Sequence, residues 1–267
     1  MRALSVLFCA MICLACVSVG TESSRVVLES AADFSSPSWV SFLQTPPQGE
    51  LPVFFAASPR MSNRDDEWGF CLQNAAVQAS RFVAVQAVST FLVNENNRDL
   101  FYLEDLDILY DRDLAEELVD KLVILREMQD RNGSYILASL DGYTMPTVPY
   151  SFSPVGGEPA WVKDFPSISG YYVGVGVAQR TGRFDTSVAA ADDRALEEII
   201  RQISVRQSTD RRDIEVDTVG TAFAQKRQEV SEAVVLGFYV FARWVSPDGA
   251  NYYSLALCPR DKNTRKS

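Results

Sequence analysis

Two stretches of the chain place apolar residues at the spacing of an amphipathic helix. Residues three and four positions apart share one helix face, so each stretch predicts a helix that packs on a sheet by that face. The first carries Leu72, Ala75, Ala79, Phe82 and Val83, and the second carries Val188, Ala191, Ala195, Leu196 and Ile199. A short apolar and aromatic segment precedes each helix, at 52–56 and at 169–173, and predicts a strand.

Each half of the chain also ends in a predicted hairpin. Residues 121–128 alternate apolar and polar side chains, turn at Asn132-Gly133 and return through 135–138. Residues 236–245, apolar on both strand faces over 238–241, are the counterpart in the second half, with a turn at Asp248-Gly249 and a return through 252–257. Asn-Gly and Asp-Gly favour tight turns, because glycine adopts a positive φ without steric penalty.

The order of these landmarks suggests an internal repeat. Pro37-Ser38-Trp39-Val40 recurs as Pro159-Ala160-Trp161-Val162, and a strand, a helix and a closing hairpin follow in both halves. We further expect strands at 88–92 and 203–207, and second helices at 113–119 and 221–233. The sequence therefore predicts an α+β fold: a tandem duplication of a small βαβαββ unit, with helices on one face of a mostly antiparallel sheet.

These boundaries divide the chain into five predicted parts. Residues 1–20 form a signal peptide, residues 37–140 a divergent first repeat and residues 159–260 a second repeat. The segment 141–158, rich in proline and glycine, is the linker. The basic residues of 261–267 form a tail.

The N-terminus predicts export. Arg2 is followed by an apolar or small stretch from Ala3 to Val19, as in secretory signal peptides. The residues allow two processing routes: cleavage before Thr21, or lipidation of Cys16 after a segment resembling a lipobox. Lipidation would anchor the protein to a membrane. We expect a location in the periplasm or at the outer membrane.

Two cysteines remain in the chain after processing, Cys71 and Cys258. An oxidising compartment permits a disulfide between them, but spacing does not determine the pairing geometry. Two buried free thiols are the alternative.

Composition removes several classes of chemistry. The 267 residues contain no histidine, which excludes Ser-His and Cys-His nucleophiles and histidine-ligated metals. The net charge of -10 disfavours nucleic acid as a partner. No pair of acidic residues stands out as catalytic. We therefore expect a protein that is not an enzyme and that uses neither a cofactor nor a metal.

Two motifs have competing interpretations. Gly174-Val175-Gly176 follows an aromatic strand, as in a dinucleotide-binding turn, but Gln179 stands where a third glycine is needed. We expect these glycines to let a helix pack closely on the strand. The acidic run from Glu104 to Asp120 lacks the glycine of a calcium loop. Its leucines keep helical spacing, which predicts the solvated face of an amphipathic helix.

Three tryptophans are candidate interface residues: Trp39 and Trp161, which open the two repeats, and Trp244 in the last hairpin. Aromatic residues are enriched where proteins bind one another. Packing against the sheet is the alternative for all three.

The second half resembles the Lpp-twenty family of outer-membrane lipoproteins. The resemblance covers residues 158–260 and rests on ordered motifs: 159–162, the Tyr-Tyr-Val-Gly-Val-Gly of 171–176, the alanine-rich helix through 189–203, and Phe241-Ala242-Arg243-Trp244. Related proteins include the FlgP and FlgT groups of flagellar disks and rings. The resemblance implies self-assembly at the outer membrane without catalysis.

Together these features predict a non-enzymatic assembly or scaffold protein of the cell envelope, and the resemblance extends this prediction to an association with the flagellum. Its expected partners are further copies of itself or other envelope proteins. The alternative is a periplasmic carrier that binds a small molecule between the two repeats. A deep apolar pocket with a few convergent polar groups at that place would favour the carrier.

Overall fold

The structure is a computed structural model that describes residues 43, 45, 47, 50–94, 101–146, 148, 158–215 and 226–261. Side chains are described for these residues except 87–109 and 205–233. The first half comprises β1 (Val53–Pro59), α1 (Arg64–Val83), β2 (Val85–Asn94), β3 (Phe101–Tyr110), α2 (Arg112–Val119), β4 (Leu122–Gln129) and β5 (Gly133–Leu140). The second comprises α3 (Ala160–Lys163), β6 (Tyr171–Gln179), α4 (Phe184–Glu215), β7 (Lys226–Val235), β8 (Tyr239–Val245) and β9 (Asn251–Pro259).

The strands form three antiparallel sheets, ordered β1-β5-β4, β3-β2-β7 and β6-β9-β8. Helices and antiparallel sheets together make an α+β protein, which confirms the predicted fold class. In the first and third sheets the initial strand of the half lies at one edge and the final strand lies in the centre. Both closing hairpins carry a register shift, at Leu125 in β4 and at Phe241 in β8.

The predicted element order βαβαββ was wrong in three places. Residues 203–207 continue α4, whose helix runs unbroken to Glu215. The described part of 221–233 belongs to strand β7. The leucines of 103–110, expected on a helix, lie in β3. A register shift at Glu104 inserts one residue into β3, and this extra residue gives the sequence its helical spacing.

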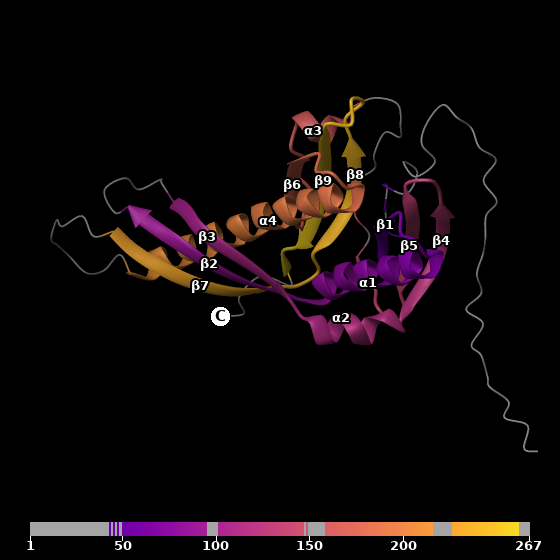
Figure 1. Ribbon diagram of the computed structural model, residues 1–267. Coiled ribbons are helices and arrows are strands. Elements are labelled where there is room, and N and C mark those ends of the chain that lie inside the picture. The colour runs from indigo at the N-terminus through magenta and orange to yellow at the C-terminus, as the bar shows by residue number, and fades with distance from the viewer. Residues whose placement is uncertain are drawn as a thin grey trace, which may run out of the picture.

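Strand β7 of the second half pairs with β2 of the first along its whole length, from Val85 opposite Val235 to Asn94 opposite Lys226. The resulting sheet β3-β2-β7 projects from the body of the molecule beside the C-terminal part of α4 (Figure 1). The two halves are therefore joined by backbone hydrogen bonds as well as by side-chain packing.

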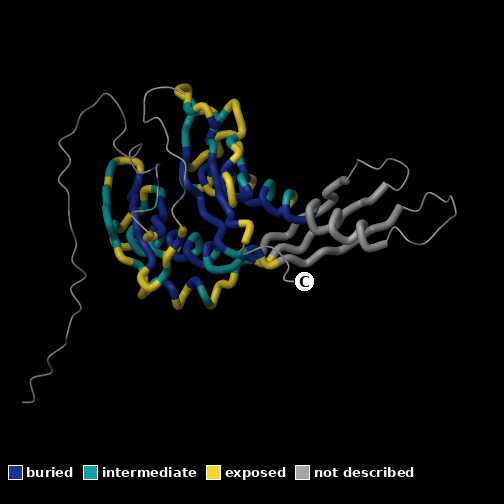
Figure 2. The backbone as a smooth tube through the Cα atoms, turned by 180° about the vertical axis from the view of Figure 1, so that it is seen from behind, coloured by how far each residue is buried: buried dark blue, intermediate teal, exposed yellow. Residues whose placement is uncertain are grey.

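One hydrophobic core is shared between the halves. Phe54 and Phe82 of the first half pack edge-to-face on Tyr239 of the second, with ring centroids 6.1 and 6.2 Å apart. Figure 2 shows buried segments running through both the β1-β5-β4 sheet and the β6-β9-β8 sheet. Edge-to-face aromatic contacts add to the free energy of burial itself, so this cluster stabilises the association of the halves.

The free edges of β1 and β6 are covered by polar side chains from the following helix. Asn74 and Gln78 of α1 donate hydrogen bonds to the carbonyl oxygens of Ala57 and Phe55 in β1. On α4, Arg194 and Gln202 donate to the carbonyl oxygens of Val177 and Val173 in β6. These contacts occupy backbone groups that an edge strand would otherwise offer to another chain.

The glycines of β6 let α4 approach the strand closely, as predicted from Gly174-Val175-Gly176. A Cβ atom on Gly174 would lie 2.1 Å from the carbonyl oxygen of Ala195, and one on Gly176 would lie 2.0 Å from that of Ala191. Alanines on the helix and glycines on the strand thus set the distance between the two elements.

We expect Gly176→Ala to destabilise the protein by about 1 to 3 kcal/mol, because the new methyl group overlaps the backbone of α4. Gly69→Ala is the matched control, since Gly69 lies inside α1 with nothing within 4 Å of its Cβ position. It should stabilise the protein by about 0.5 to 1 kcal/mol. Urea unfolding measures both, and equal stabilities of the two variants would contradict the packing account.

Candidate functional site

The halves meet around Arg243, a buried arginine of β8. Its Nε donates to Asp192 Oδ1 at 3.0 Å, and its Nη2 donates to Asp192 Oδ2 at 2.8 Å. Nη2 also donates to Gln78 Oε1 of α1 at 3.0 Å, and the guanidinium lies over the ring of Phe55 at 5.4 Å. Ser254 Oγ donates to Asp192 Oδ1 at 2.5 Å.

This network crosses the boundary between the halves. Asp192, Ser254 and Arg243 belong to the second half, whereas Gln78 and Phe55 belong to the first. The side chains of Arg243 and Asp192 are only 2% and 4% exposed, so water contributes little to their solvation. The ion pair lies within the second half and tolerates few geometries, so it holds the Arg243 guanidinium at the place where Gln78 and Phe55 of the first half contact it.

A second contact between the halves is an added strand segment. The backbone N–H of Thr45 donates to the carbonyl of Phe241 at 3.2 Å, and the N–H of Arg243 donates to the carbonyl of Leu43 at 3.0 Å. This pattern is antiparallel pairing along the outer edge of β8. Leu43 is 2% exposed and Thr45 is fully buried.

Tyr239, a core residue of β8, forms hydrogen bonds to the same segment at Thr45. Its hydroxyl donates to the carbonyl oxygens of Thr45 and Val53 and accepts from the Val53 N–H at 3.1 Å. Burial raises the pKa of this hydroxyl, although the contacts with Val53, Arg243 and Thr45 oppose that rise. Tyr239 therefore remains a protonated donor at neutral pH.

A cleft of about 280 Å³ opens between α1 and α4. Its apolar lining includes Phe55, Phe70, Val77 and Val188, and its polar lining includes Asn74, Gln78, Arg81, Arg183, Asp185, Thr186 and Asp192. Two of the charges are paired near it: Arg81 contacts Asp193 at 2.7 Å, and Arg183 contacts Asp185 at 2.5 Å. The cleft is thus amphipathic, with its cations largely neutralised.

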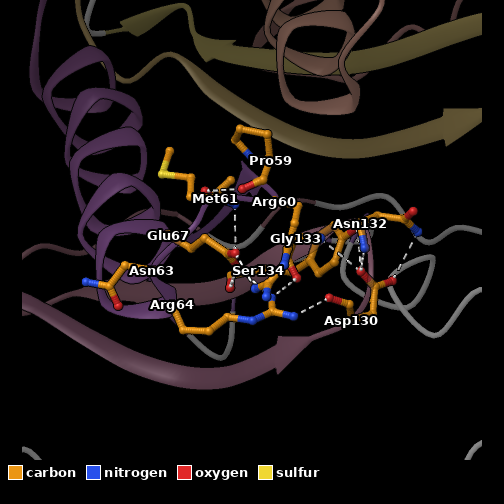
Figure 3. Close-up of polar contacts among 12 residues, drawn as sticks. Pro59, Arg60, Met61, Asn63, Arg64, Glu67, Asp130, Asn132, Gly133 and Ser134 are labelled. Atoms are coloured by element: carbon orange, nitrogen blue, oxygen red, sulfur yellow. Dashed lines mark hydrogen bonds and ion pairs between the residues drawn. The ribbon is translucent and has the colours of Figure 1, made fainter.

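A buried carboxylate with several hydrogen bonds in the first half is Glu67, at the start of α1 (Figure 3). It accepts hydrogen bonds from Arg64 Nη1 at 2.6 Å, from Ser134 Oγ at 2.6 Å, from Arg60 Nη1 at 2.8 Å and from the Met61 N–H at 2.9 Å. Arg64 also donates to the carbonyl oxygen of Asp130 at 2.7 Å. The cluster ties the start of α1 to the β4–β5 hairpin.

The hydrogen-bond donors around Glu67 together lower its pKa by more than burial raises it. Burial alone would raise the pKa of a carboxyl group, but the bonds from Ser134, Met61, Arg64 and Arg60 lower the pKa of Glu67 to about 2. Glu67 is therefore ionised at all physiological pH values, and its contacts make it a structural anchor.

Cys71 and Cys258 are both buried, and no disulfide joins them. Cys71 donates to the carbonyl of Ser134 and Cys258 to that of Leu236, each at 3.3 Å. Burial, with the nearby charges of Glu67 and Asp185, raises the pKa of Cys71 to about 12. Cys71 is therefore a poor nucleophile.

The candidate interface residues have different positions. Trp161 is 2% exposed and belongs to the shared core, so it offers no docking surface. Trp244 is partly buried and packs on Tyr253, with ring centroids 5.2 Å apart. Trp39 and the lipidation candidate Cys16 lie outside the described residues, as do the signal peptide and residues 262–267 of the tail.

The acidic run around Glu104 divides between β3 and α2, where Asp111 caps the helix by accepting from the Leu114 N–H at 3.0 Å. Within the described ranges, no three acidic or cysteine side chains converge as metal ligands. Nor does any helix in those ranges combine the length and apolarity needed to cross a membrane.

Sequence reasoning missed Asp192, Gln78 and Glu67. A usable signal existed for Glu67, because it lies four residues before Cys71 and eight before Ala75, in phase with the buried stripe of α1. Asp192 likewise follows Ala191 inside the apolar pattern of α4. A charged residue on a buried helix face needs a partner. The identity of that partner depends on how the halves pack, and the spacing of residues along the sequence does not show this packing.

Comparison with known protein families, with curated proteins and with solved structures finds no match to this chain.

We expect Arg243→Met to destabilise the protein by about 3 to 5 kcal/mol, because it leaves the Asp192 carboxylate buried without its cation. The double variant Arg243→Met/Asp192→Leu should recover part of that loss. Arg201→Met is the control, since its pair with Glu198 is exposed, and it should cost less than about 1 kcal/mol. Chemical unfolding of these variants and of Asp192→Leu alone completes the double-mutant cycle and gives the coupling energy, and additive losses would contradict the network.

The low pKa of Glu67 predicts a specific pH dependence. Its folded value of about 2 lies below the ordinary value of 4.5, so its stabilisation is complete above about pH 4.5 and is lost as the pH falls towards 2. We expect Glu67→Gln to be less stable than wild type by about 2 to 3 kcal/mol at pH 7. That difference should shrink steadily below pH 4.5 in acid titrations of unfolding, and a constant difference would refute the assignment.

Proposed function

We propose that this protein is a non-enzymatic assembly component of the cell envelope, exported to the periplasm or outer membrane, that binds further copies of itself or neighbouring envelope proteins. The observation that carries the proposal is the interface inside the chain. Two halves with the same sheet order associate through a shared aromatic core, the hydrogen bond from Arg243 to Gln78 and an added strand segment. A module that binds a similar module within one chain is suited to bind another between chains.

We propose further that the halves arose by tandem duplication, with the resemblance to the Lpp-twenty family describing the second copy. Local contacts support this proposal. The Arg60 N–H bonds to the Asn132 carbonyl just after β1, and the Arg180 N–H bonds to the Ala250 carbonyl just after β6, both at 2.8 Å. At the helix starts, the Met61 N–H bonds to Glu67 and the Thr181 N–H bonds to Ser187.

A carrier of small molecules is the second candidate, and the cleft between α1 and α4 favours it. The cleft combines apolar walls with amide, hydroxyl and charged groups, and it lies between the halves. In the carrier account the protein would be monomeric, and a small molecule would copurify with it.

Light scattering of the mature protein, with native mass spectrometry of the same sample, separates the two functions. Assembly predicts a discrete particle heavier than one chain over micromolar concentrations, with no bound small molecule. A strict monomer at high concentration would contradict assembly. A monomer that carries a stoichiometric small molecule would support the carrier instead.

A further inference from the structure

The cleft between α1 and α4 follows one face of α1. Its lining residues on that helix extend from Phe70 to Arg81, a distance of roughly 16 Å at the rise of an α-helix. Between these ends the walls are apolar, with Val77 on α1 and Val188 on α4. The cleft volume of about 280 Å³ lies just below the range of roughly 300 to 1,000 Å³ in which drug-sized ligands bind, so the cleft suits a small molecule.

Four charged side chains line the cleft, and three of them already have a bidentate partner. Arg183 donates from Nε to Asp185 Oδ1 at 3.0 Å and from Nη2 to Asp185 Oδ2 at 2.5 Å. The Asp192 carboxylate accepts from Nε and Nη2 of Arg243 at 3.0 and 2.8 Å. A bidentate pair uses the strongest hydrogen-bonding directions of both groups, so these three side chains have little capacity left for a charged ligand.

Arg81, the fourth charged residue, has donors that are not used. Its Nη1 lies 2.7 Å from Asp193 Oδ1, but among the residues that the structure describes neither that oxygen nor Arg81 Nε has a hydrogen-bond partner. The Arg81 side chain is 15% exposed and that of Asp193 is 42% exposed, so water screens the carboxylate more than the guanidinium. The Arg81 end of the cleft therefore keeps a cationic character.

We propose that the cleft binds a small carboxylate with an apolar chain or ring, with the carboxylate on Arg81 and the apolar part between Val77 and Val188. The donors of a guanidinium form a fork that matches the two oxygens of a carboxylate. A small rotation of the Arg81 side chain brings Nε to a ligand oxygen in the cleft and supplies the partner that Nε lacks. Tyr110, whose ring centroid lies 5.9 Å from the guanidinium carbon, supports the opposite side of the group.

Ligands of other charge fit this cleft less well. A cation would need Asp185 or Asp192, and both already bind a guanidinium group. An uncharged chain would bury apolar surface but would leave the donors of Arg81 without an acceptor. The net charge of -10 opposes an anion at long range, but salt at about 0.1 M screens charges beyond about 10 Å, so the contact with Arg81 decides the preference.

The site lies within one chain, so this inference goes beyond the proposed assembly function and does not depend on it. For the carrier, the second candidate function, it names the class of ligand. Because α1 and α4 belong to different halves, a ligand held between them also bridges the halves.

Isothermal titration calorimetry of the mature protein with octanoate, octan-1-ol and octylamine tests the site, because the three probes share one apolar chain and differ in the head group. Octanoate should bind at least about tenfold more tightly than octan-1-ol, since its carboxylate forms charge-assisted hydrogen bonds with Arg81. Octylamine should bind more weakly than octan-1-ol, because its cation meets the guanidinium.

Three variants locate the binding. Arg81→Met should remove the preference for octanoate over octan-1-ol. Ala189→Trp should weaken the binding of both probes at least about tenfold, because Ala189 is an exposed lining residue and the indole would fill the cleft without disturbing the core. Arg201→Met is the control, since Arg201 pairs with Glu198 outside the cleft lining, and it should bind octanoate like wild type.

The outcomes distinguish the ligand site from the functions. Equal affinities for octanoate and octan-1-ol, or an octanoate preference that survives in Arg81→Met, would overturn the carboxylate site. Absence of binding by all three probes would overturn it as well. Neither result changes assembly, which light scattering of the same sample measures separately. Should Arg81→Met fail to fold by circular dichroism, Arg81→Lys replaces it, because lysine keeps the charge but lacks the fork, and it must weaken octanoate binding.

Discussion

The position of Arg243, which its buried ion pair with Asp192 fixes within the second half, is the constraint on which the arrangement of the halves depends. Asp192 lies on the face of α4 that meets β9, where Ser254 contacts it, and Arg243 reaches from β8 to both Asp192 and Gln78. Burying two charges is unfavourable unless their geometry and hydrogen bonds are nearly ideal. Other relative positions of α1, α4 and β8 would leave Arg243, Asp192 or Gln78 buried without a hydrogen-bond partner. These polar contacts therefore favour one arrangement of the halves, and the aromatic core stabilises it.

A second constraint concerns strand edges. Every three-stranded sheet has two outer strands, and each exposes backbone groups to association. In this protein α1 covers β1 through Asn74 and Gln78, α4 covers β6 through Arg194 and Gln202, and the segment at Leu43 covers β8. Strand β4 keeps a partly exposed apolar surface.

Local patterns predicted much of the fold. The helical spacing at Leu72 and Val188, the hairpin turns at Gly133 and Gly249, and the close packing at Gly174 all follow from short-range sequence and are present in the structure. The errors arose where tertiary pairing overrides local preference. Strand β7 pairs with β2 of the other half, and the register shift at Glu104 gives a strand the spacing of a helix. The network at Arg243 joins residues far apart in sequence, so no local pattern could reveal it.

The central claim is that the two halves form one cooperative structure, held together by contacts around Arg243. Hydrogen exchange of the folded protein in increasing urea measures this directly. The account predicts that amides of β1, β5, β8 and β9 exchange through the same global opening, with equal free energies and equal urea dependence. Exchange of β8 and β9 through a separate opening, while β1 and β5 remain protected, would contradict it.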